Sequence, residues 1–504
     1  MGSAGTPIKI FDWNKYVHKN YERITVPEPY PILGHIKVDK MVERVKTIKD
    51  PLLGLISTWD QDEYSAAKWT KEAYTKMFEK FTYAKPAKIA ETYEDLWDFA
   101  TKMVLDEYSY MQNATILDIT STTKNMESTP AFPKMQLYDT EAAYIATEGW
   151  SEYRDLWNNP KRGRVLWWTF LKNEIIKNEK IRSNDIRMIM CTDPCFTRFG
   201  AAFDQHQNEM MKLRTETNQA QVGWTPFFGG LNKRLQRLSS KGDTFVELDW
   251  TRFDGTIPVE LFSHIKAIRW FFHAERLKTP ENKERYDWYV ENLINKITLL
   301  PTGEITLIRG GNPSGQISTT TDNNMVNTFL TAFEIGYMFK KKYGRAPTVL
   351  EYRSNVDSIC YGDDRVLAYN SSWIDYNVND VPGMYREIFG MWVKPEKIKK
   401  SSKLEGLSFC GMVFVQHKGE FFGVPTVNKI LASLEEPTRK LPDIQSLWGK
   451  LTSLRILTEY SSQEVNDFLE EQIQRVREYA QTENIELPEV PSYFYRSVWT
   501  GGPK

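Results

Sequence analysis

The segment SICYGDDRVL, residues 358–367, places two adjacent aspartates at a turn between two apolar runs. Glycine and aspartate both favour turns, so the simplest interpretation is a β-hairpin whose tip carries Asp363 and Asp364. Neighbouring carboxylates repel each other unless a positive charge lies between them. The tip is therefore either an ordinary solvated turn or part of a metal site, and this segment alone leaves both open.

A second acidic segment, ELDWTRFDG, favours the metal site. Asp249 ends a strand expected at 244–250, and Asp254 follows five residues later at a turn. Because side chains alternate along a strand, Asp249 can emerge beside the hairpin tip, where three carboxylates would converge and need cations. Oxygen-only ligands suit Mg²⁺ or Mn²⁺ better than zinc. A strand end with an Asx-turn is the alternative interpretation.

Two such ions about 3.5 to 4 Å apart are the usual arrangement for in-line phosphoryl transfer. One ion would lower the pKa of an attacking ribose hydroxyl, and the other would stabilise the leaving pyrophosphate. The acidic set, Asp249, Asp363 and Asp364, therefore predicts nucleotidyl transfer.

The segment GGNPSGQISTTTDNNMVN predicts a tight turn followed by a helix with a polar face. Thr319, Asn323 and Asn327 fall at positions i, i+4 and i+8 of that helix. Asparagine and threonine both donate to and accept from hydroxyl groups, as recognition of a ribose 2'-OH requires, and Asp254 could complete the contact. A solvent-facing helix start with capping residues is the alternative.

A basic segment at 161–198 contains aromatic pairs among its lysines and arginines. Such residues could neutralise a triphosphate and nearby backbone phosphates. Charge runs are more often solvated faces, and Trp167, Trp168 and Phe170 could simply be core. The basic candidates are Lys172, Lys177, Lys180, Arg182 and Arg187.

Length and composition indicate a globular protein of about three structural units. Of the 504 residues, 41% are apolar and 26% charged, and no apolar run approaches the roughly 18 to 20 residues of a membrane span. Four cysteines do not form a disulfide framework, so we interpret Cys191 and Cys195 as structural and expect a reducing compartment. The net charge of −1 does not exclude a basic channel.

Periodicity predicts an α+β architecture with a central antiparallel sheet and helices at the C-terminal end. In the last helix, Ser461 and Glu464 have the spacing of a capping box. Helices are expected at 94–108, 261–277, 382–391, 443–457 and 461–480, and strand pairs at 356–368 and 406–424.

Three segments in this order, DWTRFDG, GNPSGQISTTTDNN and YGDD, resemble motifs A, B and C of viral RNA-dependent RNA polymerases of the picornavirus-like positive-strand group. The residues of the first two motifs are most similar to those of astrovirus polymerases, and the flanking sequence also resembles this group from about residue 128 to 414. The resemblance implies a closed right hand of fingers, palm and thumb, with an antiparallel palm sheet flanked by helices. The implied divisions are an N-terminal extension and fingers (1–240, with motif F at 161–198), palm with motif A (241–270), a fingers insertion returning to the palm (271–305), palm with motifs B to E (306–423) and a helical thumb (424–504).

The resemblance also implies residue roles. Asp249 and Asp363 would be the main metal ligands, with Asp364 beside them, and Asp254 and Asn323 would sense the 2'-OH. In motif B, Thr319 would support that pair, and Ser314 and Gly315 would form a flexible loop; in motif F, Lys172, Lys180 and Arg187 would contact phosphates.

Contacts to RNA are expected from Lys177, Arg182 and Gly315, and from Ser128 and Thr129 in a segment similar to motif G. Motif D would supply a lysine that protonates pyrophosphate; Lys397 is the candidate, with Lys399 left open. The segment LSFCGMVF fits motif E by position but lacks the basic residues of some relatives.

The implied function is replication and transcription of a positive-strand RNA virus genome, joining NTPs to an RNA 3'-OH with two Mg²⁺ or Mn²⁺ ions. Expected partners are template RNA, nascent RNA and NTPs; a protein primer and other viral replication proteins are further candidates, because relatives use protein-linked or unprimed initiation. We expect a location in the host cytoplasm, at membrane-associated complexes to which other viral proteins recruit the chain.

The residues leave two alternative functions to be considered. A reverse transcriptase shares the acidic site but carries a bulky residue where this chain has Asp254. A non-catalytic RNA-binding protein on a polymerase scaffold is disfavoured, because the acidic set is complete.

Overall fold

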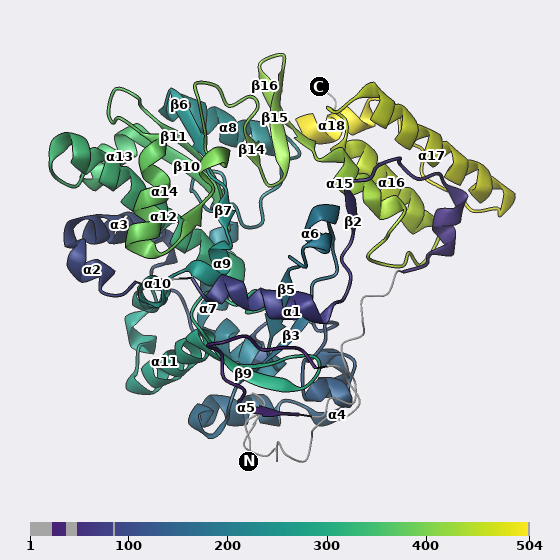
Figure 1. Ribbon diagram of the computed structural model, residues 1–504. Coiled ribbons are helices and arrows are strands. Elements are labelled where there is room, and N and C mark those ends of the chain that lie inside the picture. The colour runs from purple at the N-terminus through teal and green to yellow at the C-terminus, as the bar shows by residue number, and fades with distance from the viewer. Residues whose placement is uncertain (1–22, 37–47, 84–85, 502–504) are drawn as a thin grey trace.

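The computed structural model describes residues 23–36, 48–83 and 86–501. Residues 1–22, which begin the expected N-terminal extension, lie outside the described part. Helices and mostly antiparallel sheets alternate along the chain, so the expected α+β class is confirmed (Figure 1). Within the described ranges, no helix combines the length and the apolar character needed to cross a bilayer.

A four-stranded antiparallel sheet carries both acidic segments. Its strands run in the order β10 (Val356–Tyr361), β11 (Asp364–Tyr369), β6 (Thr244–Glu247) and β13 (Lys399–Ser401). The apolar residues on either side of the acidic turn form β10 and β11, as the sequence predicts. This sheet therefore brings chain segments more than 100 residues apart into one ladder.

The strand expected at 244–250 is wrong in its extent. The β6 ladder ends at Glu247, and the next paired residues, β7 (Trp250–Thr251), bond instead to β12 (Trp392–Val393). Leu248 and Asp249 lie in the step between the two ladders. The backbone thus leaves the sheet where Asp249 begins the acidic site.

Helix α12 (Thr319–Tyr343) lies beside this sheet, where it contacts β10. It packs against α3 (Glu94–Glu107), α10 (Val259–Phe271) and β10. Phe329, Phe333 and neighbouring apolar residues on all its sides are buried, which is typical of a helix enclosed by protein. The helices expected at 94–108 and 261–277 are confirmed, although the second ends at Phe271 and is followed by a short 3₁₀ turn.

A second, five-stranded sheet is built from strands within residues 34–309. Its order is β1 (Gly34–His35), β9 (Glu304–Arg309), β8 (Asn295–Leu299), β3 (Leu166–Leu171) and β5 (Met188–Cys191), with β3 and β8 parallel. Trp167 and Trp168 in β3 are at most 1% exposed, which confirms the core interpretation for these two aromatics. Helices α7 (Pro194–Lys212) and α11 (Pro280–Ile294) pack nearby.

The C-terminal region begins with β14 (Ser408–Phe409), β15 (Met412–His417) and β16 (Glu420–Pro425), a three-stranded sheet where the sequence predicted a strand pair. Four helices follow: α15 (Val427–Leu431), α16 (Ile444–Leu457), α17 (Gln463–Thr482) and α18 (Phe494–Thr500).

Helices α16 and α17 share an apolar cluster that also contains Ile56 and Leu431, and the predicted buried face of α16, including Leu447 and Leu451, is confirmed. The capping box predicted from Ser461 and Glu464 is wrong. Ser462 caps α17 by accepting from Val465 N, because Ser461 lies one residue too early and donates to Thr458 O.

The segment 50–66 joins the C-terminal helices to the basic segment. Ser57 N donates to Gln472 Oε1 (2.8 Å), and Trp59 Nε1 donates to Asn428 Oδ1 (2.9 Å). The strand β2 (Tyr64–Ala66) then pairs with β4 (Ile175–Lys177). The remaining helices are α1 (Lys71–Met77), α2 (Ile89–Thr92), α4 (Glu141–Glu148), α5 (Ser151–Asn158), α6 (Asn178–Arg182), α8 (Gly230–Lys241), α9 (Phe253–Thr256), α13 (Val349–Asn355) and α14 (Val381–Met384), the last continued by a π-helical turn to Phe389.

Candidate active site

The acidic turn joins β10 and β11 at the edge of the four-stranded sheet. Gly362 adopts φ +61°, a left-handed conformation that glycine adopts without strain, and Asp363 and Asp364 follow it. In the adjoining ladder Val366 lies opposite Glu247, where β6 ends, and the charge of Asp249 two residues later acts on Asp363. The sheet topology therefore brings the two predicted acidic segments together.

Two asparagines of α12 hold the backbone of this turn. Asn327 Nδ2 donates to Gly362 O (2.9 Å), and Gly362 N donates to Asn324 Oδ1 (3.2 Å). Both asparagines are buried. The polar helix face thus lies against the acidic turn, and the solvent-facing alternative is wrong. Asn324 was not predicted, because it falls outside the i, i+4 pattern.

The carboxylates of the turn lie in an electrostatically unfavourable place. Burial, followed by the nearby charges of Asp254 and Asp249, raises the pKa of Asp363 to about 6. Burial also raises the pKa of Asp364 to about 7, and the charges of Asp363 and Glu247 act in the same direction. Removing carboxylates from water and placing them together disfavours their ionised forms, and a cation would relieve both effects.

Two lysines lie close to Asp249. Its Oδ2 is 3.4 Å from Lys394 Nζ and 3.6 Å from Lys397 Nζ, and Lys394 N donates to its backbone oxygen (2.9 Å). Lys399 Nζ instead lies 3.5 Å from Glu247 Oε1. Of the two lysines that the sequence left open, only Lys397 contacts the acidic site itself. Lys394 lies in the same basic run, but its place beside Asp249 has no signal in the sequence.

Asp364 points toward the three-stranded sheet. Its Oδ2 accepts from Cys410 N (2.7 Å), in the turn between β14 and β15. Nearby, Glu247 Oε2 accepts from Ser408 Oγ (2.8 Å). Asp364 is therefore partly engaged in joining the acidic turn to its neighbouring sheet, whereas Asp363 is not held in this way.

Asp254 and Asn323 form a pair beside the carboxylates. Asp254 lies in the short helix α9, and its Oδ1 accepts from Asn323 Nδ2 (2.8 Å). Thr319 Oγ1 donates to Pro313 O (2.8 Å), so it steadies the preceding loop rather than touching the pair. The predicted contact between Asp254 and Asn323 is therefore present.

The loop before α12 lies against the edge of β5. Ser314 Oγ donates to Met188 O (2.9 Å). A Cβ on Gly315 would lie 2.2 Å from Met190 O, well inside van der Waals contact. Only glycine therefore fits where this loop meets the strand that follows the basic segment.

The basic segment is divided between paired and exposed charges. Lys172 N donates to Arg187 O (2.9 Å), and both side chains face Glu174. Arg187 pairs with that carboxylate through Nε and Nη2, at 2.7 and 2.6 Å. Two further cations, Lys180 and Arg182, lie exposed on α6, and Lys177 lies exposed at the end of β4.

Ser128 and Thr129 make only local hydrogen bonds within the described residues. Ser128 Oγ donates to Asn125 O (2.9 Å), and Thr129 Oγ1 accepts from Ala131 N (3.2 Å). Neither side chain forms a hydrogen bond with the acidic site in that part of the chain.

The acidic site fits a hard divalent cation in its chemistry. Within residues 23–36, 48–83 and 86–501, no three His, Cys, Asp or Glu side chains are already arranged to hold a metal ion. Mg²⁺ is commonly held by one or two carboxylates plus substrate phosphates, so Asp249 and Asp363 supply the right kind of ligand. The raised pKa values of the turn are consistent with a place for added positive charge.

A family model described as viral RNA-dependent RNA polymerase matches residues 17–473. The chain belongs to this family. Curated relatives are the non-structural polyproteins 1AB of Turkey astrovirus 2 (53% identity over 504 residues), Avian nephritis virus 1 (52% over 489) and Human astrovirus-5 (41% over 502). These alignments cover 97 to 98% of this chain but 31 to 34% of each polyprotein. The chain thus spans about a third of the length of these relatives.

The predicted resemblance to astrovirus polymerases is confirmed. As an RNA-dependent RNA polymerase the chain is an enzyme that handles RNA and nucleoside triphosphates, and its family uses divalent metal ions. The family match also decides against the reverse transcriptase and non-catalytic alternatives. This RNA-dependent RNA polymerase carries its acidic turn where the antiparallel sheet and α12 meet.

Proposed function

We propose that this polymerase replicates and transcribes a positive-strand RNA virus genome by two-metal nucleotidyl transfer from NTPs to an RNA 3'-OH. One observation carries the proposal: the charges of Asp249 and Asp254 both act on Asp363 in the acidic turn, and Asp254 pairs with Asn323 of α12. Carboxylates for metal binding and a hydroxyl-recognising pair therefore occupy one site.

Asp249 and Asp363 are the proposed metal ligands, with Asp364 in a lesser role because its Oδ2 already accepts from Cys410 N. Two bound Mg²⁺ or Mn²⁺ ions would activate the attacking hydroxyl and offset charge on the departing pyrophosphate. Lys397, near Asp249, is the proposed proton donor to pyrophosphate. The ammonium group of Lys394 helps to hold the Asp249 carboxylate in place.

Recognition of the incoming nucleotide is assigned to two groups of residues. Asp254 and Asn323 recognise the ribose 2'-OH, supported by Thr319 and by the loop that contains Ser314. The triphosphate is neutralised by Lys172, Lys180 and Arg187. Arg187 is the best placed of these, since its positive charge acts on Asp363.

Contacts to RNA are proposed for Lys177, Arg182, Gly315, Ser128 and Thr129. The first two are exposed cations: Lys177 ends β4, which pairs with β2, and Arg182 lies in α6 directly after β4. Such cations bind the phosphate backbone without regard to sequence. A protein primer, other viral replication proteins and membrane-associated complexes of the host cytoplasm remain further proposals for this chain.

We further propose a closed right hand. Fingers (with the N-terminal extension, 1–240), palm (241–270 and 306–423), a fingers insertion (271–305) and a thumb (424–504) are the assigned divisions. Closure is supported by the segment 50–66, which contacts α15 and α17 of the proposed thumb and pairs with β4 of the proposed fingers.

Extension of a labelled self-priming RNA hairpin tests the proposal. Wild type with Mg²⁺ or Mn²⁺ should add rNTPs far better than dNTPs, and chelation should stop synthesis. Asp363→Ala should abolish extension while RNA binding largely persists, because it removes a metal ligand and not a phosphate contact. Retained synthesis by Asp363→Ala would show that the metal assignment is wrong.

A further inference from the structure

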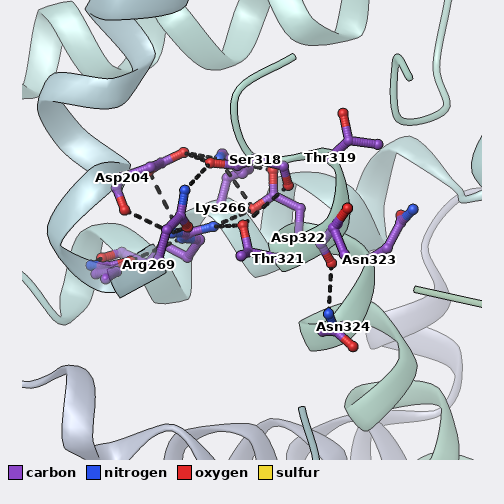
Figure 2. A network of polar contacts seen from close by, with 12 residues as sticks. Asp204, Lys266, Arg269, Ser318, Thr319, Thr321, Asp322, Asn323 and Asn324 are labelled. Atoms are coloured by element: carbon purple, nitrogen blue, oxygen red, sulfur yellow. Dashed lines mark hydrogen bonds and ion pairs between the residues drawn. The ribbon is translucent and has the colours of Figure 1, made fainter. Parts of the chain in front are cut away.

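A buried ion cluster lies beneath the start of α12. Asp322 is 2.8 Å from Arg269 Nη1 and 3.0 Å from Lys266 Nζ, and Asp204 is 2.8 Å from the same Lys266 Nζ (Figure 2). All four residues are at most 1% exposed, and they come from α7, α10 and α12. Buried charges persist only when paired and hydrogen-bonded, so this cluster strongly favours one arrangement of the three helices.

Gln316, in the loop before α12, connects this cluster to the loop. Its Nε2 donates to Asp322 Oδ2 (3.0 Å) and to Asn312 Oδ1 (2.8 Å). Its Oε1 accepts from Ser318 N (3.1 Å). Because the amide nitrogen faces two acceptors and the amide oxygen faces a donor, the orientation of the Gln316 amide is fixed.

Asn312 connects the Gln316 amide to the active site through hydrogen bonds of its own side chain. Its Nδ2 donates to Asn323 Oδ1 (2.9 Å) and to Thr319 O (3.0 Å). Since Asn323 Oδ1 is the acceptor of that bond, Asn323 Nδ2 is the group that faces Asp254 Oδ1, at 2.8 Å. Asn312 is fully buried and Asn323 is 4% exposed, so water does not readily replace these bonds.

We infer that Gln316 and Asn312 are positioning residues for sugar selection, because they orient Asn323 toward Asp254. The inference rests on the proposed role of Asp254 and Asn323 at the ribose 2'-OH. Each amide in the series Gln316, Asn312, Asn323 donates to the next residue, and the last donates to Asp254. A reversed amide at either of the first two positions would turn the Asn323 carbonyl toward the Asp254 carboxylate, and the two would repel each other.

Gln316→Glu tests the polarity of this series with little change in shape. The substitution replaces both amide donors by acceptors opposite Asn312 Oδ1 and the Asp322 carboxylate. We expect the ratio of kcat/KM for an rNTP to that for the matching dNTP to fall about tenfold, the effect of losing roughly one hydrogen bond to a charged group. Single-nucleotide extension of the RNA hairpin measures this ratio.

Asn312→Asp tests the same series at its next member and should lower the ratio in the same direction. If Gln316→Glu does not fold, Asn312→Asp alone tests whether the series orients Asn323. Gln236→Glu is the matched control, because it makes the same chemical change on an exposed position of α8 and should leave the ratio unchanged. Melting temperatures of all variants separate local effects from loss of the fold.

A double-mutant cycle with Asp254→Ala separates positioning from general damage. If Gln316 acts through Asp254, then Gln316→Glu should not lower the ratio further when Asp254 is already alanine. An unchanged ratio in Asp254→Ala alone would overturn the proposed ribose role. A lowered ratio in Asp254→Ala, with unchanged ratios in both Gln316→Glu and Asn312→Asp, would overturn the positioning inference only. A merely structural role would lower kcat for rNTPs and dNTPs equally.

Discussion

Lys397 and Lys399 are two residues apart but contact different carboxylates. Lys397 Nζ lies 3.6 Å from Asp249, whereas Lys399 Nζ lies 3.5 Å from Glu247, which also accepts from Ser408. Alternation along β13 and the turn before it sends the two side chains to different neighbours. At the scale of a single residue, position in the ladder decides which lysine can serve the proposed chemistry.

We therefore predict that Lys397→Ala lowers the rate of nucleotide addition by at least about tenfold, because loss of a general acid typically costs 10²- to 10⁴-fold. Lys399→Ala is the matched control and should stay within about twofold of wild type. Single-turnover incorporation at saturating NTP across pH 6 to 9 measures both. A larger loss in Lys399→Ala than in Lys397→Ala would contradict the assignment.

A second residue-scale prediction concerns His273, which lies among the rings of Phe203, Trp270 and Tyr286. Burial lowers the pKa of His273 to about 4; the charge of Asp204 opposes this effect, and the charge of Arg269 adds to it. Because the folded pKa is below the ordinary value of about 6.5, protonation favours the unfolded chain. Its contribution to stability is thus present above about pH 6.5 and is lost as the pH falls toward 4.

Between pH 7 and pH 5 this residue alone should lower the free energy of unfolding by about 2 kcal/mol. His273→Phe replaces the titrating ring by an apolar one and should reduce the drop in melting temperature over that interval. Melting curves of wild type and variant at both pH values measure the difference. An equal drop in both proteins would show that other groups dominate the acid response.

At the scale of elements, the loop 310–318 depends on its close approach to β5. A Cβ on Gly315 would lie 2.2 Å from Met190 O, so the loop or the strand has to move. Gly315→Ala should cost about 1 to 3 kcal/mol of stability in this conformation and should lower nucleotide addition, because the same loop leads into α12 and the Asp254–Asn323 pair.

Gly449→Ala is the matched control for that prediction. Gly449 lies inside α16 with no atom within 4 Å of an added Cβ, so alanine should leave activity unchanged and raise stability by up to about 1 kcal/mol. Thermal melting and hairpin extension together test the pair. Wild-type activity in Gly315→Ala would show that the loop tolerates displacement from β5.

Elements were the easiest part of the fold to predict. The hairpin around Gly362, helix α3 and the apolar face of α16 follow from local periodicity and turn residues, which act over a few positions. The end of β6 at Glu247 and the cap at Ser462 could not be located in this way. Ladder partners and competing hydrogen bonds decide such boundaries, and both depend on packing.

At the scale of the whole molecule, the segment 50–66 ties the N-terminal region to the C-terminal helices. Trp59 donates to Asn428 Oδ1, and its ring lies 5.2 Å from that of Phe468. Trp59→Ala should weaken this connection by about 1 to 3 kcal/mol, since it removes a hydrogen bond and part of an apolar contact.

We expect Trp59→Ala to shorten the RNA products made per binding event, while single-nucleotide addition stays near wild type because the acidic site is untouched. Faster proteolytic cleavage within 50–66 should accompany this change. Phe271→Ala is the control, since Phe271 is 56% exposed. If cleavage within 50–66 becomes faster but the product lengths match those of wild type, the connection is not needed to retain RNA, and the prediction is wrong.

The sequence by itself determined the family, the hairpin turn that carries Asp363 and Asp364, and the polar face of α12, because these depend on residue types at short, regular spacings. Only the tertiary structure decided that Lys397 rather than Lys399 contacts Asp249, that Asp364 accepts from Cys410 N, and that Gln316 and Asn312 orient Asn323. Asn323 and Asp254 are 69 residues apart, and Lys394 and Asp249 are 145 apart. Periodicity says nothing about such distant pairs; the packing of helices and strands brings their atoms within bonding distance.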